Sequence, residues 1–241
     1  MLNKTRGIVL HSIAYNDKYS IVHLYTESFG RASYLVSRSR GRKSTVSHAL
    51  FSPFSVLDME VDHKNNRDIH RIKEIKSHCS TNNLSCDPIK NIVTLFLAEV
   101  VFRVVRETEP DKELFNFLLH TIQELDRTQK NVANFHLVFL LHLLHYQGIS
   151  PNIDSFNEEA YFDLLNGEFT DTIPMHKHYL SRQESNIFAQ LLRINFENMH
   201  AYEFARTERV SIIQTILNYY RLHLPPFSEI KSIAIMQSLF D

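Results

Sequence analysis

The sequence has few cysteines and no long apolar run, and both absences limit what the chain can be. Its only cysteines are Cys79 and Cys86, separated by six residues. They lack the CxxC spacing and a second pair, which excludes a disulfide framework and a four-cysteine zinc site. No apolar run reaches the roughly eighteen residues of a membrane span, and the N-terminus lacks the apolar core of a signal peptide. We therefore expect a cytoplasmic protein.

The common nucleotide-binding and hydrolase motifs are missing as well. The sequence contains no P-loop, no GxSxG and no glycine-rich Rossmann fingerprint. This leaves an NTPase, an α/β hydrolase or a dehydrogenase without support. We expect no catalytic centre, no cofactor and no small-molecule substrate.

The charges divide the chain into two parts. Residues 1–80 hold thirteen Lys and Arg against seven Asp and Glu, a net charge of +6, whereas the remaining residues carry −7 and bring the total to −1. A basic N-terminal part is typical of an anion-binding module, and an acidic remainder suits protein partners or solubility. We expect a domain boundary near residue 80, with 1–80 and 81–241 as the two domains.

Short strands are predicted throughout the basic part. Each run has four to eight residues rich in Val, Ile, Tyr or Leu, and the clearest alternates Leu57, Met59 and Val61 with three acidic residues. Tight turns are expected at Ser28-Phe29-Gly30 and at Asn65-Asn66. Five such strands suit an OB-fold barrel, a common oligonucleotide-binding fold, although an SH3-like barrel would give a similar pattern. The predicted strands are Gly7–Ile13, Ser20–Thr26, Arg31–Val36, Val56–Val61 and Ile69–Ile75.

Helical periodicity begins at Asp87-Pro88, an N-cap followed by proline at the first helical position. The first helix is expected to end near Glu107 and the second to begin at Asp111. A capping-box sequence at Ser181 predicts a later helix. The fold class is therefore α+β, an N-terminal five-stranded barrel followed by an all-α domain. An irregular insert is expected at 149–178, with a short hairpin near Asn166-Gly167. The other predicted helices span 131–146, 181–196, 207–222 and 228–240.

The basic segment that follows the third strand is the strongest functional signal. A strand from Arg31 leads directly into four cations separated by Ser and Gly, which leave the backbone adaptable and suit phosphate oxygens. A solvated charged loop remains the alternative. Tyrosines interleaved with the cations could stack on unpaired bases. The predicted DNA-binding residues are Lys4, Arg6, Arg31, Tyr34, Arg38, Arg40, Arg42, Lys43, Arg67, Arg71 and Lys73.

Two other chemistries have candidate residues. Asp58, Glu60 and Asp62 share one strand face and could hold metal ions in a nuclease, although an ordinary solvated strand face has the same pattern. Among fourteen histidines, the pairs His142/His145 and His176/His178 could contribute to a metal site. They lack the metalloprotease spacing, so capped or partly buried imidazoles are the favoured interpretation. We expect no metal.

Several short motifs resemble a known family, the bacterial RecO recombination mediators. The resemblance covers essentially the whole chain. It implies an OB-fold, a helical domain, and a protein that binds single- and double-stranded DNA, anneals complementary strands and helps RecR and the single-stranded DNA-binding protein SSB to load recombinase. The motifs are Gly7-Ile-Val-Leu-His11, Tyr25-Thr-Glu-Ser-Phe-Gly30, the basic segment after Val36, Leu50-Phe-Ser-Pro-Phe54, and Tyr219-Tyr-Arg-Leu-His223 through Lys231-Ser232.

One departure from the family concerns the insert. Many members hold zinc there with two CxxC pairs, but residues 149–178 contain no cysteine. We therefore expect aromatic packing to hold this segment, with Phe156, Tyr161, Phe162 and Phe169 as candidates. The resemblance also implies capture of the acidic SSB tail, for which Arg103 and Arg106 are the candidates. A protein-interaction scaffold that acts through the helical domain is the remaining alternative.

Overall fold

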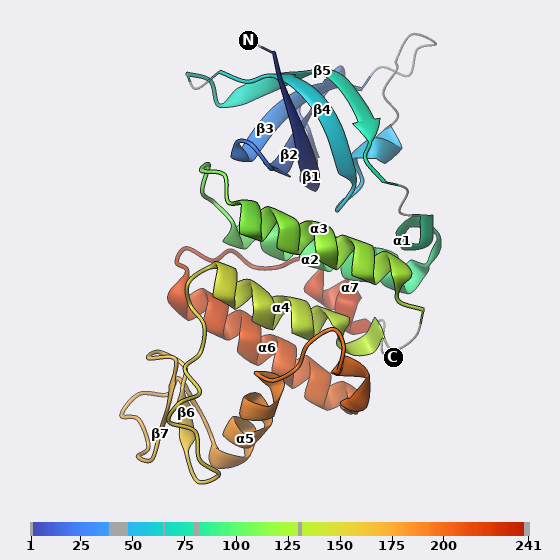
Figure 1. Cartoon of the computed structure of the whole chain (residues 1–241). Helices are drawn as coiled ribbons and strands as arrows, with labels where there is room; N and C mark the ends of the chain where they lie inside the picture. The colour runs from blue at the N-terminus through green and yellow to red at the C-terminus, as the bar shows by residue number, and fades with distance from the viewer. Residues whose placement is uncertain (1, 39–47, 65, 80–81, 130–131, 239–241) are drawn as a thin grey trace. The chain divides into compact units, whose positions relative to one another are not determined.

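The computed structural model describes residues 2–38, 48–64, 66–79, 82–129 and 132–238. By internal contacts the chain forms two compact units. One comprises Met1–Thr128 together with Ile230–Leu239, and the other comprises Gln129–Glu229 with the last two residues. Figure 1 shows the barrel and the helices α2 and α3 of the first unit, and the helices and small sheet of the second.

The first unit contains a closed five-stranded barrel in the order β1-β2-β3-β5-β4. The β3–β5 pair is parallel and the other pairs are antiparallel. This order confirms the predicted barrel and is that of an OB-fold. The first strand starts five residues before its predicted start, because Leu2–Ile8 pairs with β4. The strands are β1 (Leu2–Ala14), β2 (Tyr19–Thr26), β3 (Gly30–Ser37), β4 (Val56–Asp62) and β5 (Ile69–Ser77).

Alternation along the strands builds the barrel core. Leu57, Met59 and Val61 are buried, whereas the acidic residues between them are partly exposed, as predicted. The predicted turn before β3 is also confirmed, since Gly30 has a φ of +56°. Asn65 lies outside the described residues, so the predicted Asn65-Asn66 turn stays a prediction. A 3₁₀ turn, His48–Phe51, precedes β4.

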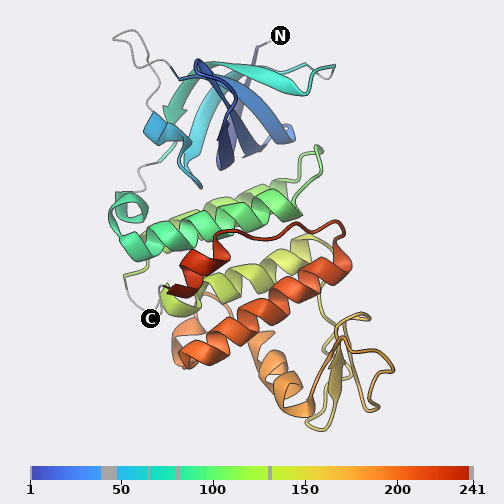
Figure 2. The same ribbon diagram turned by 180° about the vertical axis from the view of Figure 1, so that it is seen from behind.

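Helices α2 (Pro88–Val104) and α3 (Lys112–Arg127) pack against one end of the barrel, where α2 contacts β1 (Figure 2). Asp87 and Asp111 cap their N-termini, each through a side chain that accepts two backbone N–H groups. The ring of Tyr25 lies 6.4 Å from that of Phe115, and its hydroxyl lies 3.4 Å from the carbonyl oxygen of Asp111. Apolar helix residues thus bury the barrel surface at this end. A short helix that the sequence pattern did not predict, α1 (Asn82–Cys86), precedes α2.

Helix α7 (Ile233–Ser238) belongs to the barrel unit although it follows the second unit in sequence. The Glu99 carboxylate on α2 accepts hydrogen bonds from the backbone N–H groups of Lys231 and Ser232 and from the Ser232 hydroxyl. These bonds hold the start of α7 against α2. The helix begins five residues after its predicted start at Ser228, and the predicted end at residue 240 lies outside the described residues.

The second unit is built around helices α4 (Phe135–Tyr146), α5 (Arg182–Leu191) and α6 (Arg206–His223). The predicted capping box at Ser181 is present. Helix α5 ends earlier than predicted, because Asn195 and Asn198 bond each other's backbone N–H groups through their side chains and form a turn. The Tyr220 hydroxyl on α6 donates to the Leu140 carbonyl on α4. Two 3₁₀ turns, Val132–Asn134 and Met199–Ala201, complete the helical part.

The insert and the two residues that follow it form a small sheet of β6 (Tyr161–Asp163), β7 (Glu168–Thr170) and β8 (Tyr179–Leu180). The predicted hairpin is present, with Gly167 at a φ of +70°. Aromatic packing holds it, as expected: the Phe162 ring lies 4.8 Å from Phe169 and 4.7 Å from Phe188. The Asp163 carboxylate accepts the N–H groups of Leu165 and Asn166. The His176 imidazole lies 3.2 Å from the same carboxylate.

The described part of the chain contains neither a cluster of metal-binding side chains nor a membrane-spanning helix. Among these residues, no group of three or more His, Cys, Asp or Glu side chains is placed to hold a metal ion. None of the described helices combines the length and the apolar character that crossing a membrane requires.

Substitution of Gly30 tests the approach of the β2–β3 turn to the segment after α2. A Cβ at this position would collide with the Glu109 carbonyl group, and the left-handed backbone itself costs a non-glycine residue about 1–2 kcal/mol. Gly30→Ala should therefore lower the free energy of unfolding by more than Gly148→Ala. Gly148 also has a positive φ, but no described atom lies within 4 Å of the place where a Cβ would stand. Equal losses in urea unfolding would show that the turn does not press on Glu109.

Burial of His136 predicts acid sensitivity. This α4 side chain has no exposed surface, and burial lowers its pKa to about 3. Below pH 6.5 the unfolded chain binds a proton that the folded chain does not, so the free energy of unfolding falls with pH. Between pH 7.5 and 5.5 this single group should remove about 1.4 kcal/mol. His136→Gln should flatten the pH profile from urea unfolding by that amount, and a profile of unchanged slope would contradict the assignment.

Candidate nucleic-acid interface

The basic segment after β3 begins at Arg38. Arg40, Arg42 and Lys43 lie outside the described residues, and their roles stay predictions. The Arg38 N–H donates to the Lys18 carbonyl at 2.7 Å, and its Nη1 donates to the Asn16 carbonyl at 3.2 Å. Both bonds join the start of the basic segment to the turn between β1 and β2.

That turn is itself held by hydrogen bonds. The Asn16 side-chain oxygen accepts the N–H groups of Lys18 and Tyr19, each at 2.9 Å. Tyr15 and Tyr19 are 62% and 40% exposed. The structure thus brings two exposed aromatic rings beside two cations. We refer to Tyr15, Lys18, Tyr19 and Arg38 as the hairpin-tip surface.

Other aromatic side chains of the barrel pack against protein side chains and are not free to contact DNA. Tyr34 has no exposed surface and Tyr25 is 1% exposed, so both are core side chains. The Phe29 ring is stacked on His63 at 4.0 Å. Tyr34 was predicted to contact DNA, but a ring enclosed by the barrel core cannot stack on a base without unfolding the barrel. We therefore leave it out of the interface.

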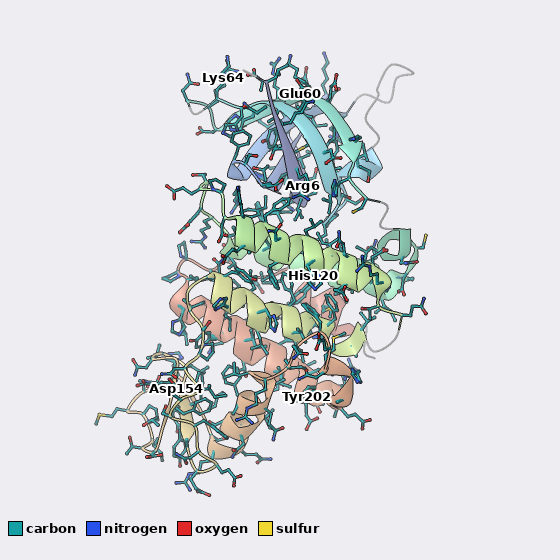
Figure 3. All side chains as sticks on the ribbon, in the orientation of Figure 1. Arg6, Glu60, Lys64, His120, Asp154 and Tyr202 are labelled. Carbon is teal, nitrogen blue, oxygen red and sulfur yellow. The ribbon has the colours of Figure 1, made fainter. Side chains whose placement is uncertain are left out.

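The outer face of β1, β4 and β5 carries balanced charge. Arg6 forms a bidentate pair with Glu27 at 2.8 and 2.9 Å, which lowers the pKa of the Glu27 carboxyl. Across the strands Lys4 is opposite Glu60, and Asp62 is opposite Arg71. Figure 3 shows Arg6 and Glu60 on this barrel. Lys4, Arg6 and Arg71 therefore alternate with carboxylates, so this face is not a continuous positive surface.

Asp58 takes part in the same charge balance. Its carboxylate lies 3.6 Å from the Lys76 amine and 2.9 Å from the His78 imidazole. A hollow of about 620 Å³ on this face is lined by cations as well as by acidic residues. The carboxylates proposed for a nuclease thus lie among cations, and this geometry does not favour that alternative.

Arg31 connects the barrel to helix α2. Its Nη1 donates to the carbonyls of Phe102 and Val105, both at 2.9 Å, and its guanidinium lies 4.3 Å from the centre of the Phe102 ring. Carbonyl groups at the end of a helix lack partners within the helix, and a cation satisfies them well. Arg31 therefore has a structural role at this helix end, which the alternating strand pattern gave no means to foresee.

Arg103 and Arg106 lie at the same end of α2. The Arg103 guanidinium is 3.7 Å from the Glu99 carboxylate and 5.6 Å from the Phe102 ring centre. Arg106 is exposed, and its Nε donates to the Arg103 carbonyl. The two side chains are neighbours, as expected of residues three apart at a helix end, but Arg103 already has an acidic partner.

The sequence pattern alone did not single out Lys18 or the grouping of the hairpin tip. The signal was present in Tyr-Asn-Asp-Lys-Tyr, because asparagine commonly closes a turn by accepting backbone N–H groups two and three residues later.

Arg67, another predicted DNA-binding residue, lies in the loop between β4 and β5. With Arg31 and Arg106 it lines a separate pocket.

Comparison with known proteins agrees with this architecture. Residues 1–80 match the family model described as "Recombination protein O N terminal", and residues 86–232 match "Recombination protein O C terminal". A DNA repair protein RecO of Azobacteroides pseudotrichonymphae is 45% identical over 241 residues, with both chains covered completely. Those of Bacteroides fragilis and Porphyromonas gingivalis are 44% and 38% identical, again over the full length of both chains. The chain therefore belongs to the RecO family of DNA repair proteins.

Proposed function

We propose that the protein binds single- and double-stranded DNA without sequence specificity, anneals complementary strands, and helps RecR and SSB to load recombinase. Family membership supports the role in DNA repair and recombination. The observation that carries DNA binding is the hairpin-tip surface, where Tyr15 and Tyr19 are exposed beside Lys18 and Arg38. Exposed rings next to cations are the combination that single-stranded nucleic acid requires.

The chemistry of this surface explains why binding would not depend on sequence. Every base has a flat face that an exposed tyrosine can stack on, and every nucleotide has a phosphate that a cation can neutralise. The basic segment continues from Arg38 through Arg40, Arg42 and Lys43. These cations lower the repulsion between two backbones, which is the main obstacle to bringing complementary strands together.

Partner binding rests on the family resemblance. We propose that Arg103 and Arg106 contact the acidic tail of SSB, since carboxylates pair readily with guanidinium groups. The neighbouring Phe102 supplies an aromatic ring at the same helix end. We propose RecR as the second protein partner. We also propose that the protein is located in the cytoplasm, at the nucleoid.

Stacking at the hairpin tip can be tested by changing the ring alone. Tyr15→Leu with Tyr19→Leu keeps apolar side chains but removes both rings, and base stacking on such rings contributes roughly 1–3 kcal/mol each. The double leucine variant should bind a single-stranded oligonucleotide at least about fivefold more weakly in fluorescence anisotropy. Tyr15→Phe with Tyr19→Phe keeps the rings and should bind as the unchanged protein does. Equal loss in both variants, or none in either, would remove stacking from the mechanism.

The position of the phosphate backbone can be tested through the salt dependence. Lys18→Gln with Arg38→Gln removes two cations from the hairpin tip, and should reduce the slope of log affinity against log salt by roughly 1.4 for single strands. Lys4→Gln with Lys76→Gln removes the same charge from the balanced outer face and should leave the slope unchanged. If only the second pair reduces the slope, the DNA lies on the outer face and the proposed interface is wrong.

A further inference from the structure

A cationic pocket lies beside the β2–β3 turn. This turn is at the opposite end of strands β2 and β3 from the hairpin-tip surface. The pocket volume is about 560 Å³, and the β2–β3 turn, the β4–β5 loop and the segment after α2 form its walls. Arg31 at the start of β3, Arg67 in the β4–β5 loop and Arg106 after α2 line it. Asp68 is the one acidic side chain among its described lining residues. All of these residues belong to the barrel unit.

Two histidines form an aromatic wall of this pocket. The His63 ring is stacked between Phe29 at 4.0 Å and His70 at 3.8 Å, and His70 in turn contacts Tyr34. His70 Nδ1 accepts the Lys64 N–H at 3.4 Å, whereas His63 Nδ1 is buried and has no hydrogen-bond partner in the described part of the chain. Buried polar nitrogens are normally satisfied, so this imidazole has an unmatched nitrogen among the described residues.

Two of the pocket arginines are not neutralised locally. Within the described residues, neither Arg31 nor Arg67 forms an ion pair, and burial together with the nearby Arg106 and Arg103 lowers the pKa of Arg31. Both bonds from Arg31 to the end of α2 leave from Nη1, so the helix engages only one of its three guanidinium nitrogens. Like charges held together in this way repel one another, and a bound anion relieves the repulsion.

We propose that this pocket binds a phosphate monoester group. Guanidinium groups match phosphate oxygens with paired N–H donors, and three of them around a concave site suit a dianion with three terminal oxygens. The hydroxyl side chains of Ser28 and Thr108 line the same pocket and can donate to further phosphate oxygens. The volume of about 560 Å³ lies in the range of small-ligand sites and is too small for a DNA duplex. The group can come from the 5′ end of a DNA strand or from a free phosphate compound.

The histidine wall provides an independent signature. Burial lowers the pKa of both His63 and His70; His70 faces Asp62 and Asp68, which raise its pKa, and Arg67, which lowers it. Without a bound anion, burial therefore favours the neutral form of both imidazoles. A bound dianion favours the protonated forms, so phosphate should raise the pKa of both rings.

The experiment uses the full chain and compares two charge-matched variants. Arg67→Gln removes a pocket cation, whereas Arg71→Gln removes an exposed cation that does not line the pocket. Each protein is titrated with an oligonucleotide of about twelve residues that carries either a 5′ phosphate or a 5′ hydroxyl. We expect the phosphorylated strand to bind at least about fivefold more tightly to the unchanged protein and to Arg71→Gln. The preference should be lost in Arg67→Gln.

A second arm separates a DNA end from a free phosphate compound. Inorganic phosphate is added while the imidazole signals of His63 and His70 are followed by NMR across pH. Raised pKa values in the unchanged protein but not in Arg67→Gln, without any preference for the phosphorylated strand, assign the pocket to a free phosphate compound. If neither arm responds, or if Arg71→Gln behaves as Arg67→Gln does, the proposal is overturned. Both readouts stay valid if the hairpin tip does not bind DNA, because the 5′ hydroxyl strand and inorganic phosphate act as internal references.

Discussion

The contact between Arg31 and the end of helix α2 determines which side of the barrel is available. The guanidinium satisfies two helix carbonyls and lies over the Phe102 ring, and the rings of His11 and His23 lie 4.8 and 5.1 Å from the same ring. The parts of β1, β2 and β3 that pack directly on α2 are therefore not available to a ligand. Among the described residues of the barrel, the exposed surfaces include the hairpin-tip surface, the charge-balanced face of β1, β4 and β5, and the cationic pocket beside the β2–β3 turn.

The exposed regions differ in how their cations are used. On the balanced face, carboxylates lie opposite basic side chains across the strands, so the field there is weak at a distance. At the hairpin tip, Lys18 and Arg38 form no ion pair among the described residues, and exposed tyrosine rings lie beside them. The net charge of +6 for residues 1–80 is therefore unevenly distributed. The balanced face is less positive than this total suggests, and the hairpin tip carries positive charge that is unpaired among the described residues.

Periodicity predicted most of the fold because burial imposes it. Alternation at Leu57, Met59 and Val61 located a strand, and the capping residues Asp87 and Ser181 located helix starts to the residue. Site residues were less predictable, because the alternation that places Tyr34 on a strand face does not say whether that face is inside the barrel. The role of Arg31 depends on a helix some seventy residues later, which local pattern does not register. The grouping of Tyr15, Lys18 and Arg38 could not be predicted, because it depends on the register that pairs Tyr19 with Ser37.

The central claim is that DNA lies across the tip of the β1–β2 hairpin. Photo-crosslinking of a single strand that carries 5-iodouracil, followed by peptide mass spectrometry, tests it most directly, because this base couples to aromatic rings that it stacks on. The account predicts crosslinks at Tyr15 or Tyr19. Crosslinks confined to tyrosines of the second unit, such as Tyr161 or Tyr202, would contradict it.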